Sequence, residues 1–365
     1  MNIDNILVIR FRQMGDAVLA TPLLDTLRAN FPQARIDFVL NERIAPLFEN
    51  HKAIDRIITF KEEERHNKMA YIKKVWSIVH DIRYDVIIDM RSTVNTILFA
   101  AFSTSTKYTI GLDKAYTRLF FKYRIPKECM THENMIDHNL RLAKPLLTGK
   151  SDTYCRELSL NITDEEKSKF RQYMQEQGID FSRPVMLVGV TTKLENKTWP
   201  EERMAETLSL LTSKYPQLQL IFNYAKGKEA ENARRIYEKM TLSQEPGLIP
   251  SSDSLHQKSI FLNIEAKSMR QLAAMAANCT AYFGNEGGAR HIVHAMGRPS
   301  MVVCSPMANK RVWLPADTNI PVWGIAASDI AETKGLSSEQ QYQLITVERV
   351  WEKLKDFIDN VVLKS

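Results

Sequence analysis

ILVIRFRQMGD, residues 6–16, begins as an apolar run typical of a buried strand and breaks at Gly15 into a helical pattern. A stretch with the same plan, FGNEGGARH at residues 283–291, lies near the other end of the chain. Such strand-to-helix turns place polar side chains and free backbone N–H groups at the C-terminal edge of a parallel sheet, where open α/β sheets bind ligands. One turn in each half predicts two Rossmann-like α/β domains that face each other across a cleft.

The first half alternates strand-like and helix-like runs. Apolar runs predict strands at 6–9, 36–40, 57–60 and 86–89, with helical periodicity at 17–30 and 69–83. This βαβα order predicts a parallel sheet covered by helices.

The second half repeats this pattern after a polar, helical segment at about 143–183, which we interpret as the interdomain segment. The predicted domains are residues 1–175 and 176–365. The apolar spacing of 347–358 predicts a last helix that either caps its own sheet or packs back on the first domain. Strands are predicted at 185–190, 218–222, 260–263, 281–283 and 301–304, separated by helices.

The composition is that of a globular protein with room for two domains. Of 365 residues, 44% are hydrophobic and 25% charged. The longest strongly apolar stretch, 97–102, is far shorter than a membrane span, and the N-terminus lacks the basic region of a secretory signal. The four cysteines show no CxxC spacing, so we expect reduced thiols in a cytosolic protein; they are Cys129, Cys155, Cys279 and Cys304.

The net charge of +6 is unevenly distributed. Residues 1–150 hold 23 Lys and Arg against 17 Asp and Glu, whereas the remainder holds 26 of each. Basic and aromatic residues interleave at 107–127, which favours an anionic partner: a phosphorylated lipid, a membrane surface or nucleic acid. The alternative is an ordinary solvated surface with scattered lysines.

The first turn carries an acid between basic residues. Gly15 is the only glycine in the first 110 residues, so this turn lacks GxGxxG and NAD binding there is excluded. Asp16 is either a helix cap or a general base that faces a substrate hydroxyl. Arg10 and Arg12 are candidates for holding the anionic groups of an acceptor or the phosphates of a donor.

The segment TTKLENKTWP, residues 191–200, leaves the first strand of the second half and enters a helix that Pro200 can open. Thr191 and Thr192 offer hydroxyl groups and Lys197 offers a cation, which together suit a diphosphate. The alternative is a polar loop with an incidental lysine.

The glycine-rich turn gives the stronger signal. Gly287 and Gly288 directly precede a helix and leave backbone N–H groups for phosphate oxygens, while Glu286 would accept hydrogen bonds from sugar hydroxyls. His291 is a donor-site candidate or a buried core histidine. With His294 at i, i+3 and no third ligand evident, we reject a metal site.

An acid follows the second strand of this half, within Lys226-Gly227-Lys228-Glu229. Rossmann-type halves place an acid on ribose hydroxyls at this position, so Glu229 is a candidate ribose ligand. The alternative is an acid that only complements a helix N-terminus.

Three colinear motifs resemble glycosyltransferase family 9, the ADP-heptose:lipopolysaccharide heptosyltransferases. They are ILVIRFRQMGDAVLATP at 6–22, TTKLENKTWP at 191–200 and GNEGGARHIVHAMGRP at 284–299, within a resemblance that spans about 5–315. The resemblance implies a GT-B fold and an inverting, metal-independent transfer without a cofactor. It also implies a lipopolysaccharide-core acceptor, not nucleic acid, at the cytoplasmic face of the inner membrane, with peripheral contact to the anionic bilayer.

The resemblance also assigns roles. It implies that Asp16 is the catalytic base of an N-terminal acceptor domain, and that the C-terminal domain binds the nucleotide sugar. Thr191, Thr192 and Lys197 would hold the donor diphosphate, Glu229 the ribose, and Glu286, Gly287, Gly288 and His291 would form the donor loop. We expect acceptor contacts from Arg10, Arg12, Lys114, Arg118, Lys122 and Arg124.

One departure concerns the donor. Family members commonly have Asp-Ser/Thr-Gly where this chain has Glu286-Gly287-Gly288, so the carboxylate is one methylene longer and a hydroxyl is missing. The donor is therefore ADP-heptose or another nucleotide sugar. The alternatives are another nucleotide-sugar enzyme of this fold, such as an epimerase, and a non-catalytic protein that binds sugar nucleotides or anionic lipids.

Overall fold

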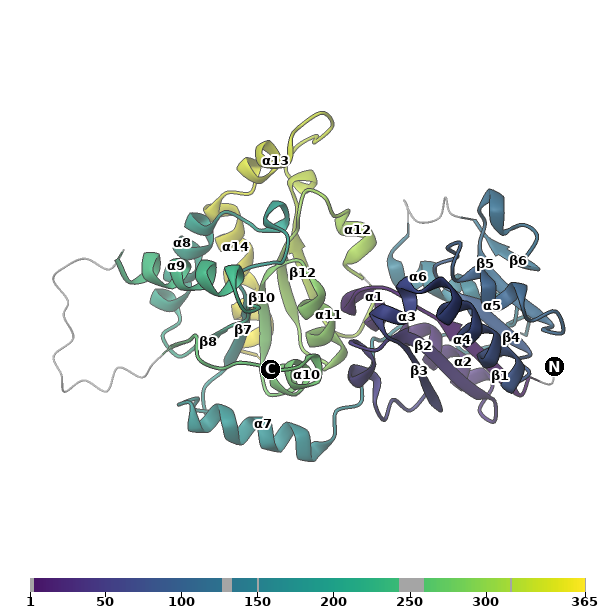
Figure 1. Ribbon diagram of the computed structural model, residues 1–365. Helices are drawn as coiled ribbons and strands as arrows, with labels where there is room; N and C mark the ends of the chain where they lie inside the picture. Colours follow the sequence, from purple (N-terminus) through teal and green to yellow (C-terminus); the bar gives the residue numbers. More distant parts are fainter. Residues whose placement is uncertain (1–2, 127–132, 150, 243–258, 316, 365) are drawn as a thin grey trace. The chain divides into compact units, whose positions relative to one another are not determined.

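The computed structural model describes residues 3–126, 133–149, 151–242, 259–315 and 317–364. The chain divides into two compact units, residues 1–161 and 162–365, each built on a six-stranded parallel sheet with helices (Figure 1). The predicted α/β class with two Rossmann-like domains is confirmed.

The first sheet has the order β3-β2-β1-β4-β5-β6. Its order reverses beside β1, which pairs with β2 on one side and β4 on the other, so ligands are expected at the C-terminal ends of β1 and β4. The strands are β1 (Asn5–Ile9), β2 (Arg35–Asn41), β3 (Arg56–Phe60), β4 (Val86–Asp89), β5 (Tyr108–Leu112) and β6 (Tyr123–Ile125).

Helices cover both faces of this sheet. Buried side chains of α4 and α5 pack with those of β1 to β4 on one face, and α2 packs with α6. The helices are α1 (Met14–Val18), α2 (Thr21–Asn30), α3 (Glu62–His66), α4 (Lys68–Asp81), α5 (Ile97–Ala101) and α6 (Met135–Leu140), with the 3₁₀ turns η1 (Ala45–Phe48), η2 (Ala115–Thr117) and η4 (Arg141–Ala143).

The single helix predicted at 17–30 is two helices. Pro22 has no N–H to donate to the carbonyl of Val18, and the Thr21 hydroxyl donates to that carbonyl instead at 2.9 Å. Helix α1 therefore ends at Val18 and α2 begins at Thr21. The break separates the helix of Asp16 from the longer helix behind it.

The second sheet has the order β12-β11-β10-β7-β8-β9, and it reverses beside β7 in the same way. Its strands are β7 (Val185–Gly189), β8 (Gln219–Phe222), β9 (Ile260–Phe261), β10 (Ala281–Asn285), β11 (Ser300–Val303) and β12 (Val322–Ile325). Its helices are α7 (Asp164–Glu176), α8 (Glu201–Lys214), α9 (Lys228–Leu242), α10 (Met269–Ala277), α11 (Gly288–Ala295), α12 (Lys310–Trp313), α13 (Ser338–Leu344) and α14 (Val347–Phe357), with the short turns η5 (Glu195–Lys197), η6 (Ala327–Asp329) and η7 (Ile358–Val362).

The boundary lies between Asn161 and Ile162, earlier than the predicted boundary after residue 175. Helix α7 belongs to the second unit because it packs on α10: Arg270 donates to both carboxylate oxygens of Glu166, and the Asn278 amide donates to the carbonyl of Lys167 at 2.9 Å. The polar sequence of α7 resembled a linker, yet its buried face fixes it to this unit.

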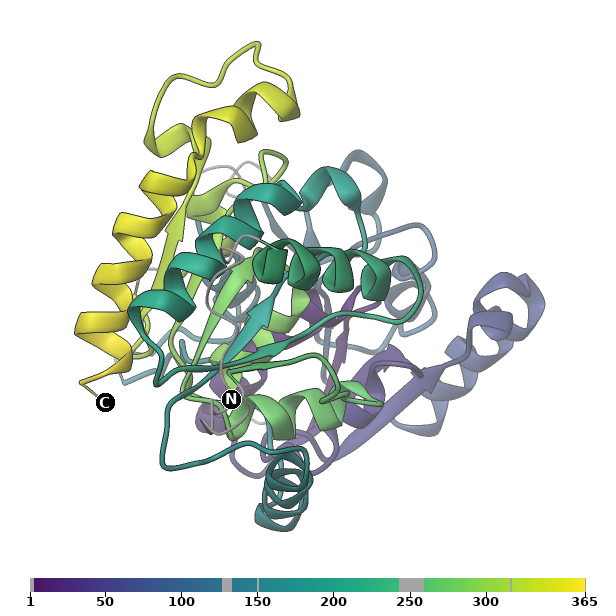
Figure 2. The same cartoon turned by 90° about the vertical axis from the view of Figure 1, so that its left-hand side faces the viewer.

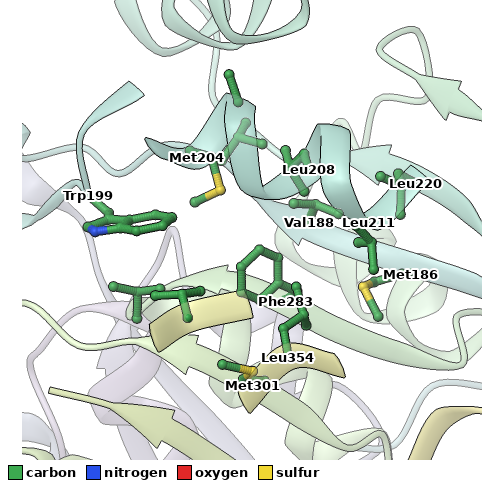
Figure 3. Close-up of a cluster of buried hydrophobic side chains, with 14 of the residues drawn as sticks. Met186, Val188, Trp199, Met204, Leu208, Leu211, Leu220, Phe283, Met301 and Leu354 are labelled. Carbon is green, nitrogen blue, oxygen red and sulfur yellow. The ribbon is translucent and has the colours of Figure 1, made fainter. Parts of the chain in front are cut away.

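The last helix caps its own sheet. Val350, Leu354 and Phe357 of α14, at i, i+4 and i+7, are fully buried in the core that α8 shares. Figure 2 shows α14, in yellow, alongside the second unit. Figure 3 shows this core, with Met204 of α8 beside the Trp199 indole. Of the two alternatives for the C-terminal helix, packing within the second unit is confirmed.

Two further findings concern the described residues. Within them, no helix combines the length and apolar character needed to cross a bilayer. Cys155, Cys279 and Cys304 are free thiols, while Cys129 lies outside the described residues.

Candidate active site

Asp16 lies in the first turn of α1, directly after β1. Its carboxylate accepts a hydrogen bond from Arg10 Nη2 at 3.1 Å, and Arg12 Nε lies 3.8 Å away. The N-cap of α1 is Gln13, so Asp16 does not occupy the capping position that the alternative interpretation required. The side chain remains 12% exposed, which leaves the carboxylate accessible to a small polar group.

Arg10 contacts Asp16 from a buried position. It is buried and donates to the Asp16 carbonyl at 3.3 Å and to the Met90 carbonyl at 3.2 Å, besides the Asp16 carboxylate. Burial lowers the pKa of Arg10 to about 10 although Asp16 opposes the shift, so the guanidinium stays charged at neutral pH. The predicted acceptor contact by Arg10 does not suit a side chain that is 4% exposed; it positions Asp16 instead.

Arg91 joins this edge and was not predicted. It follows β4, the neighbour of β1, and its Nη1 donates to the Phe11 carbonyl at 2.6 Å. Burial lowers the pKa of Arg91, and the positive charges of Arg12 and Arg65 lower it further. A cluster of cations beside Asp16 suits an anionic ligand.

Asp89 fixes the loop that carries Arg91. One carboxylate oxygen accepts hydrogen bonds from the backbone N–H of Arg91 at 2.9 Å and of Ser92 at 2.7 Å. Ser92 adopts a positive φ of 52°, a conformation that L-residues rarely adopt. Burial raises the pKa of Asp89, and we interpret its role as structural.

The structure divides the predicted basic patch. Lys114 lies at the Asp16 edge, where its Nζ donates to the carbonyls of Arg91 at 2.9 Å and Ser92 at 2.7 Å. Lys122 precedes β6 and donates to the Thr106 carbonyl at 2.6 Å, at the opposite, N-terminal edge of the sheet. Lys122 therefore does not lie with Lys114 at the Asp16 edge, and its contact with an acceptor stays a prediction.

The rest of the patch is solvent-facing. Arg118 is exposed, and Arg124 lies 3.9 Å from Asp113 across a partly exposed ion pair. Lys127 lies outside the described residues. Among the described residues, neither Arg118 nor Arg124 forms a hydrogen bond or ion pair with the residues at the Asp16 edge, so the predicted patch is spread over several surfaces.

In the second unit, two predicted donor residues meet. The Thr191 hydroxyl, which follows β7, donates to Glu229 Oε2 at 3.0 Å, and the Ala225 N–H donates to the same oxygen at 3.3 Å. Glu229 lies in the first turn of α9, after β8. The carboxylate is thus fixed at the C-terminal ends of two neighbouring strands, where a ribose ligand is expected.

Thr192 and Lys197 lie in one short loop. The Thr192 hydroxyl donates to the Leu194 carbonyl at 2.7 Å and lies 2.9 Å from the Thr198 hydroxyl, so it shapes the loop. Lys197 is half-buried, and its ammonium group forms no ion pair with any of the described residues. A held loop with an unpaired cation suits a diphosphate.

Asn285 connects this loop to the glycine-rich turn and was not predicted. Its amide nitrogen donates to the carbonyls of Gly189 and Val190, each at 3.0 Å, and its oxygen accepts from the Trp199 N–H at 2.7 Å. Trp199 is fully buried and donates its indole N–H to the Ile345 carbonyl at 3.1 Å. Both ends of the Lys197 loop are therefore anchored to β10.

The turn itself depends on a close backbone approach. Gly284 has φ +140°, and a Cβ there would lie 2.4 Å from the Gly189 carbonyl oxygen. Gly287 is extended, and α11 begins at Gly288 with its first N–H groups without helical partners. Glu286 is 8% exposed at this helix start, and an anionic ligand there would meet the N–H groups beside the carboxylate.

His291 and Arg290 are buried in α11. Arg290 Nη2 lies 2.9 Å from His291 Nδ1 and donates to the Trp313 carbonyl at 2.8 Å. Burial and the Arg290 charge hold the pKa of His291 well below its usual range, so the imidazole is neutral at pH 7. His291 is 2% exposed, as the alternative of a buried core histidine expects, and its contact with a donor phosphate stays a prediction. Arg290, which was not predicted, supplies the nearby cation.

These contacts also bear on metals. A charged guanidinium beside His291 Nδ1 opposes cation binding there. Across the part of the chain that the structure describes, no group of three His, Cys, Asp or Glu side chains gathers as a metal ion would require.

Comparisons with known proteins give the family. A model of glycosyltransferase family 9 (heptosyltransferase) matches residues 72–343. Lipopolysaccharide heptosyltransferase 1 of Campylobacter coli is 20% identical over 304 residues, covering 82% of this chain and 83% of that protein.

Solved structures give the fold. A glycosyl transferase family 9 protein from Veillonella parvula aligns with a TM-score of 0.80 at 18% identity, covering 100% of this chain and 99% of that one. ADP-heptose lps heptosyltransferase II of E. coli aligns with a TM-score of 0.72 at 19% identity, covering 99% of each chain.

The family match contains the Lys197 loop, Glu229 and the glycine-rich turn, and Asp16 precedes it. It spans most of the chain, and the two-unit α/β architecture agrees with that of the aligned structures. The chain therefore belongs to glycosyltransferase family 9, the heptosyltransferases, and is a glycosyltransferase of the lipopolysaccharide heptosyltransferase kind.

Proposed function

We propose that this protein moves heptose, or a related sugar, from an ADP-sugar to a hydroxyl of a lipopolysaccharide-core acceptor, with inversion and without a metal. The observation that carries the proposal is Asp16, an accessible carboxylate held by the buried Arg10 at the reversal point of the first sheet. The similar E. coli protein is an ADP-heptose heptosyltransferase by name, which supports that donor for this chain.

The reaction needs one base. Asp16 accepts the proton of the acceptor hydroxyl as its oxygen attacks the anomeric carbon. The bond from that carbon to the donor phosphate oxygen breaks, and its electron pair leaves with the nucleoside diphosphate on the opposite face. The diphosphate leaves as an anion and needs no second acid, unlike the leaving oxygen in glycoside hydrolysis.

The second unit would stabilise that leaving anion. Lys197, which has no ion-pair partner among the described residues, neutralises charge on the diphosphate. Thr191 and Thr192 donate hydrogen bonds once their hydroxyl groups turn to the ligand from Glu229 and from the Leu194 carbonyl, and the free N–H groups at the start of α11 bind phosphate oxygens. Glu229 receives ribose hydroxyls once Thr191 turns toward the ligand.

The sugar is set by a longer carboxylate than is common in the family. Glu286 accepts hydrogen bonds from sugar hydroxyls at the start of α11, and Gly287 leaves open the space of the missing hydroxyl side chain. A Cβ at Gly287 would have no atom within 4 Å, so a bulkier sugar substituent fits beside it.

The acceptor is anionic and membrane-held. Arg12, Arg91 and Lys114 converge near Asp16 and suit acceptor phosphates or carboxylates. We place the protein at the cytoplasmic face of the inner membrane, in peripheral contact with the bilayer and without nucleic acid or a cofactor.

The test replaces the base. Asp16→Asn keeps the shape but cannot take the proton, so turnover should fall by roughly 10² to 10⁴ while donor affinity stays unchanged. The control is Glu42→Gln, an exposed carboxylate after β2 at the same edge of the sheet. Turnover is followed as release of nucleoside diphosphate together with the glycosylated acceptor.

Near-normal turnover of Asp16→Asn would remove Asp16 from the mechanism. Conversion of the nucleotide sugar without any acceptor would favour an epimerase. Binding of sugar nucleotides without turnover for any acceptor would favour a non-catalytic binding protein.

A further inference from the structure

Helix α4 carries apolar side chains on both sides. Its inner side buries Tyr71, Val75, Ile78 and Val79 in the core of the first unit. Its outer side exposes Met69 by 75%, Ile72 by 39% and Trp76 by 51%. The spacing of these three, i, i+3 and i+7, places them in one stripe, which we call the α4 stripe. Surface apolar residues are usually scattered singly, so a stripe calls for an explanation.

The central residue of the stripe is held at the surface. The Trp76 ring stacks on His80, with ring centroids 3.8 Å apart, and meets the edge of Phe102 at 5.3 Å. The indole is therefore ordered on the outer side of α4 and does not turn into the core. An ordered, exposed tryptophan is suited to an interface where one side is apolar and the other wet.

Helix α4 carries lysines beside the stripe, while the acids Glu62 and Glu63 lie on the preceding helix α3. Lys68 and Lys73 are exposed, and no ion pair of either occurs within the described ranges, whereas Lys74 is engaged by Glu64 at 2.8 Å. Asp81 is the single acid of α4, at its far end. The α4 stripe thus combines apolar side chains that can insert into a membrane with lysines next to them. This is the pattern of helices that lie on anionic membranes.

One end of α5 lies beside the stripe. Phe102 ends α5 beside Trp76, and Ile97 and Ala100 of the same helix pack with Phe121. Two residues before Phe121, Leu119 is 92% exposed among the basic residues of 113–124. All of the net positive charge of the chain lies in residues 1–150. The apolar and basic features therefore belong to one unit.

A second copy of the chain is a poorer occupant. A stable dimer interface takes about 800 Å² from each partner, far more than three partly exposed side chains supply. In a symmetric dimer, Lys68 and Lys73 would also face their own copies, which costs free energy. An anionic bilayer meets both lysines with phosphates and accepts the three apolar side chains.

We propose that the α4 stripe docks the first unit on an anionic lipid bilayer, with Met69, Ile72 and Trp76 at headgroup depth and Lys68 and Lys73 on lipid phosphates. The inference rests on the proposed function in so far as a membrane-held acceptor gives the docking its purpose. It adds an anchor on α4, a segment outside the basic patch.

The test compares a triple variant with a matched control. Met69→Ser/Ile72→Ser/Trp76→Ser removes the stripe, while Leu210→Ser/Leu363→Ser removes two apolar side chains of the second unit that are exposed by 38% and 39%. Each protein is sedimented with phosphatidylcholine vesicles that contain phosphatidylglycerol, and with phosphatidylcholine alone. The triple variant should bind the anionic vesicles at least about tenfold more weakly than the parent, and the control should match the parent.

A charge variant separates the two components. Lys68→Gln/Lys73→Gln should weaken binding to anionic vesicles by several-fold. It should also remove most of the contribution that this face makes to the parent's preference for anionic over neutral vesicles. Because Lys68 and Lys73 are exposed and form no ion pair within the described residues, thermal unfolding of this variant should remain that of the parent. Equal sedimentation of the parent and the triple variant would overturn the proposal, as would a parent that self-associates without lipid through the stripe.

Activity separates this inference from the proposed function. A water-soluble acceptor fragment without acyl chains should be glycosylated equally by the parent and the triple variant, whereas an acceptor embedded in vesicles should be used less well by the variant. If the parent glycosylates neither acceptor, the proposed function fails and the sedimentation result still decides the docking. If both acceptors are used equally by parent and variant, the docking has no role in catalysis and this inference is wrong.

Discussion

Arg10 and Asp16 make one functional unit from two residues on different elements. The proposed role of Asp16 as a base requires its carboxylate to point in one direction, and the Arg10 guanidinium holds it there by a 3.1 Å contact from a buried position. Arg10 in turn is tied to the Met90 carbonyl, at the end of the neighbouring strand. The direction of Asp16 therefore depends on the pairing of β1 with β4.

At Lys197 we expect a binding defect without a folding defect. Lys197→Ala removes a half-buried cation that has no ion-pair partner among the described residues, so both the sugar nucleotide and the bare nucleoside diphosphate should bind about 1.5 to 3 kcal/mol more weakly. Lys193→Ala, an exposed lysine of the same loop, is the control. Titration calorimetry with ADP measures both. Equal affinity of the two variants would make Lys197 an ordinary surface residue.

Sequence patterns predict which residues lie at a site better than they predict which distant residues contact them. Asp16 and Glu286 could be identified because glycines mark the turns that carry them. Arg91 follows an equally apolar strand without a glycine, and its closeness to Asp16 depends on the strand order, which local patterns do not contain. Asn285 was missed for the same reason, since its three hydrogen bonds reach backbone groups around β7 and at Trp199.

Strands could be predicted from the sequence where both faces of the strand are buried. The run at 86–89 is strand β4 with the predicted bounds, because every residue in it is buried. Strands β5 and β12 were not predicted, since Gly111 and Gly324 interrupt their short apolar runs. The position of Lys122 at the N-terminal edge of the sheet depends on β5 and β6, which were not predicted.

Helix α7 gives a pH-dependent test of the second unit. Arg270 and the capping contacts of Thr163 lower the pKa of Glu166 to about 2 from an ordinary 4.5. Since the folded pKa is the lower one, the pair stabilises the fold fully above pH 4.5, and this contribution is lost as the pH falls toward 2. Glu166→Gln keeps a residue able to form the capping box but removes the charge.

The free energy of unfolding should therefore be lower for Glu166→Gln than for the parent at about pH 7, and the difference should shrink steadily below pH 4.5. Urea unfolding followed by tryptophan fluorescence measures it, because four of the five tryptophans lie in the second unit. Glu165→Gln, an exposed neighbour on α7, is the control. A difference that stays constant down to about pH 2 would contradict an ionic origin.

The proposed catalytic and donor-binding residues lie in different units of the molecule. Asp16 and its arginines belong to residues 1–161, and every predicted donor ligand belongs to residues 162–365. The charge follows the same division, with the positive excess in the first 150 residues. This division could be predicted from the two glycine turns and the charge count, whereas the boundary could not, because α7 is polar outside Phe170 and Met174.

If this division holds, ADP alone should protect only the second unit from hydrogen exchange. Diphosphate oxygens that take up the free N–H groups at the start of α11 should slow exchange at 284–291, and the ordered Lys197 loop should slow it at 190–198. Residues 10–16 and 89–92 should exchange as in the free protein, because in the proposed function they contact the acceptor and not ADP. Exchange measured by mass spectrometry with Lys197→Ala as the control tests this, and protection by ADP at 10–16 would assign the diphosphate to the arginines around Asp16 instead.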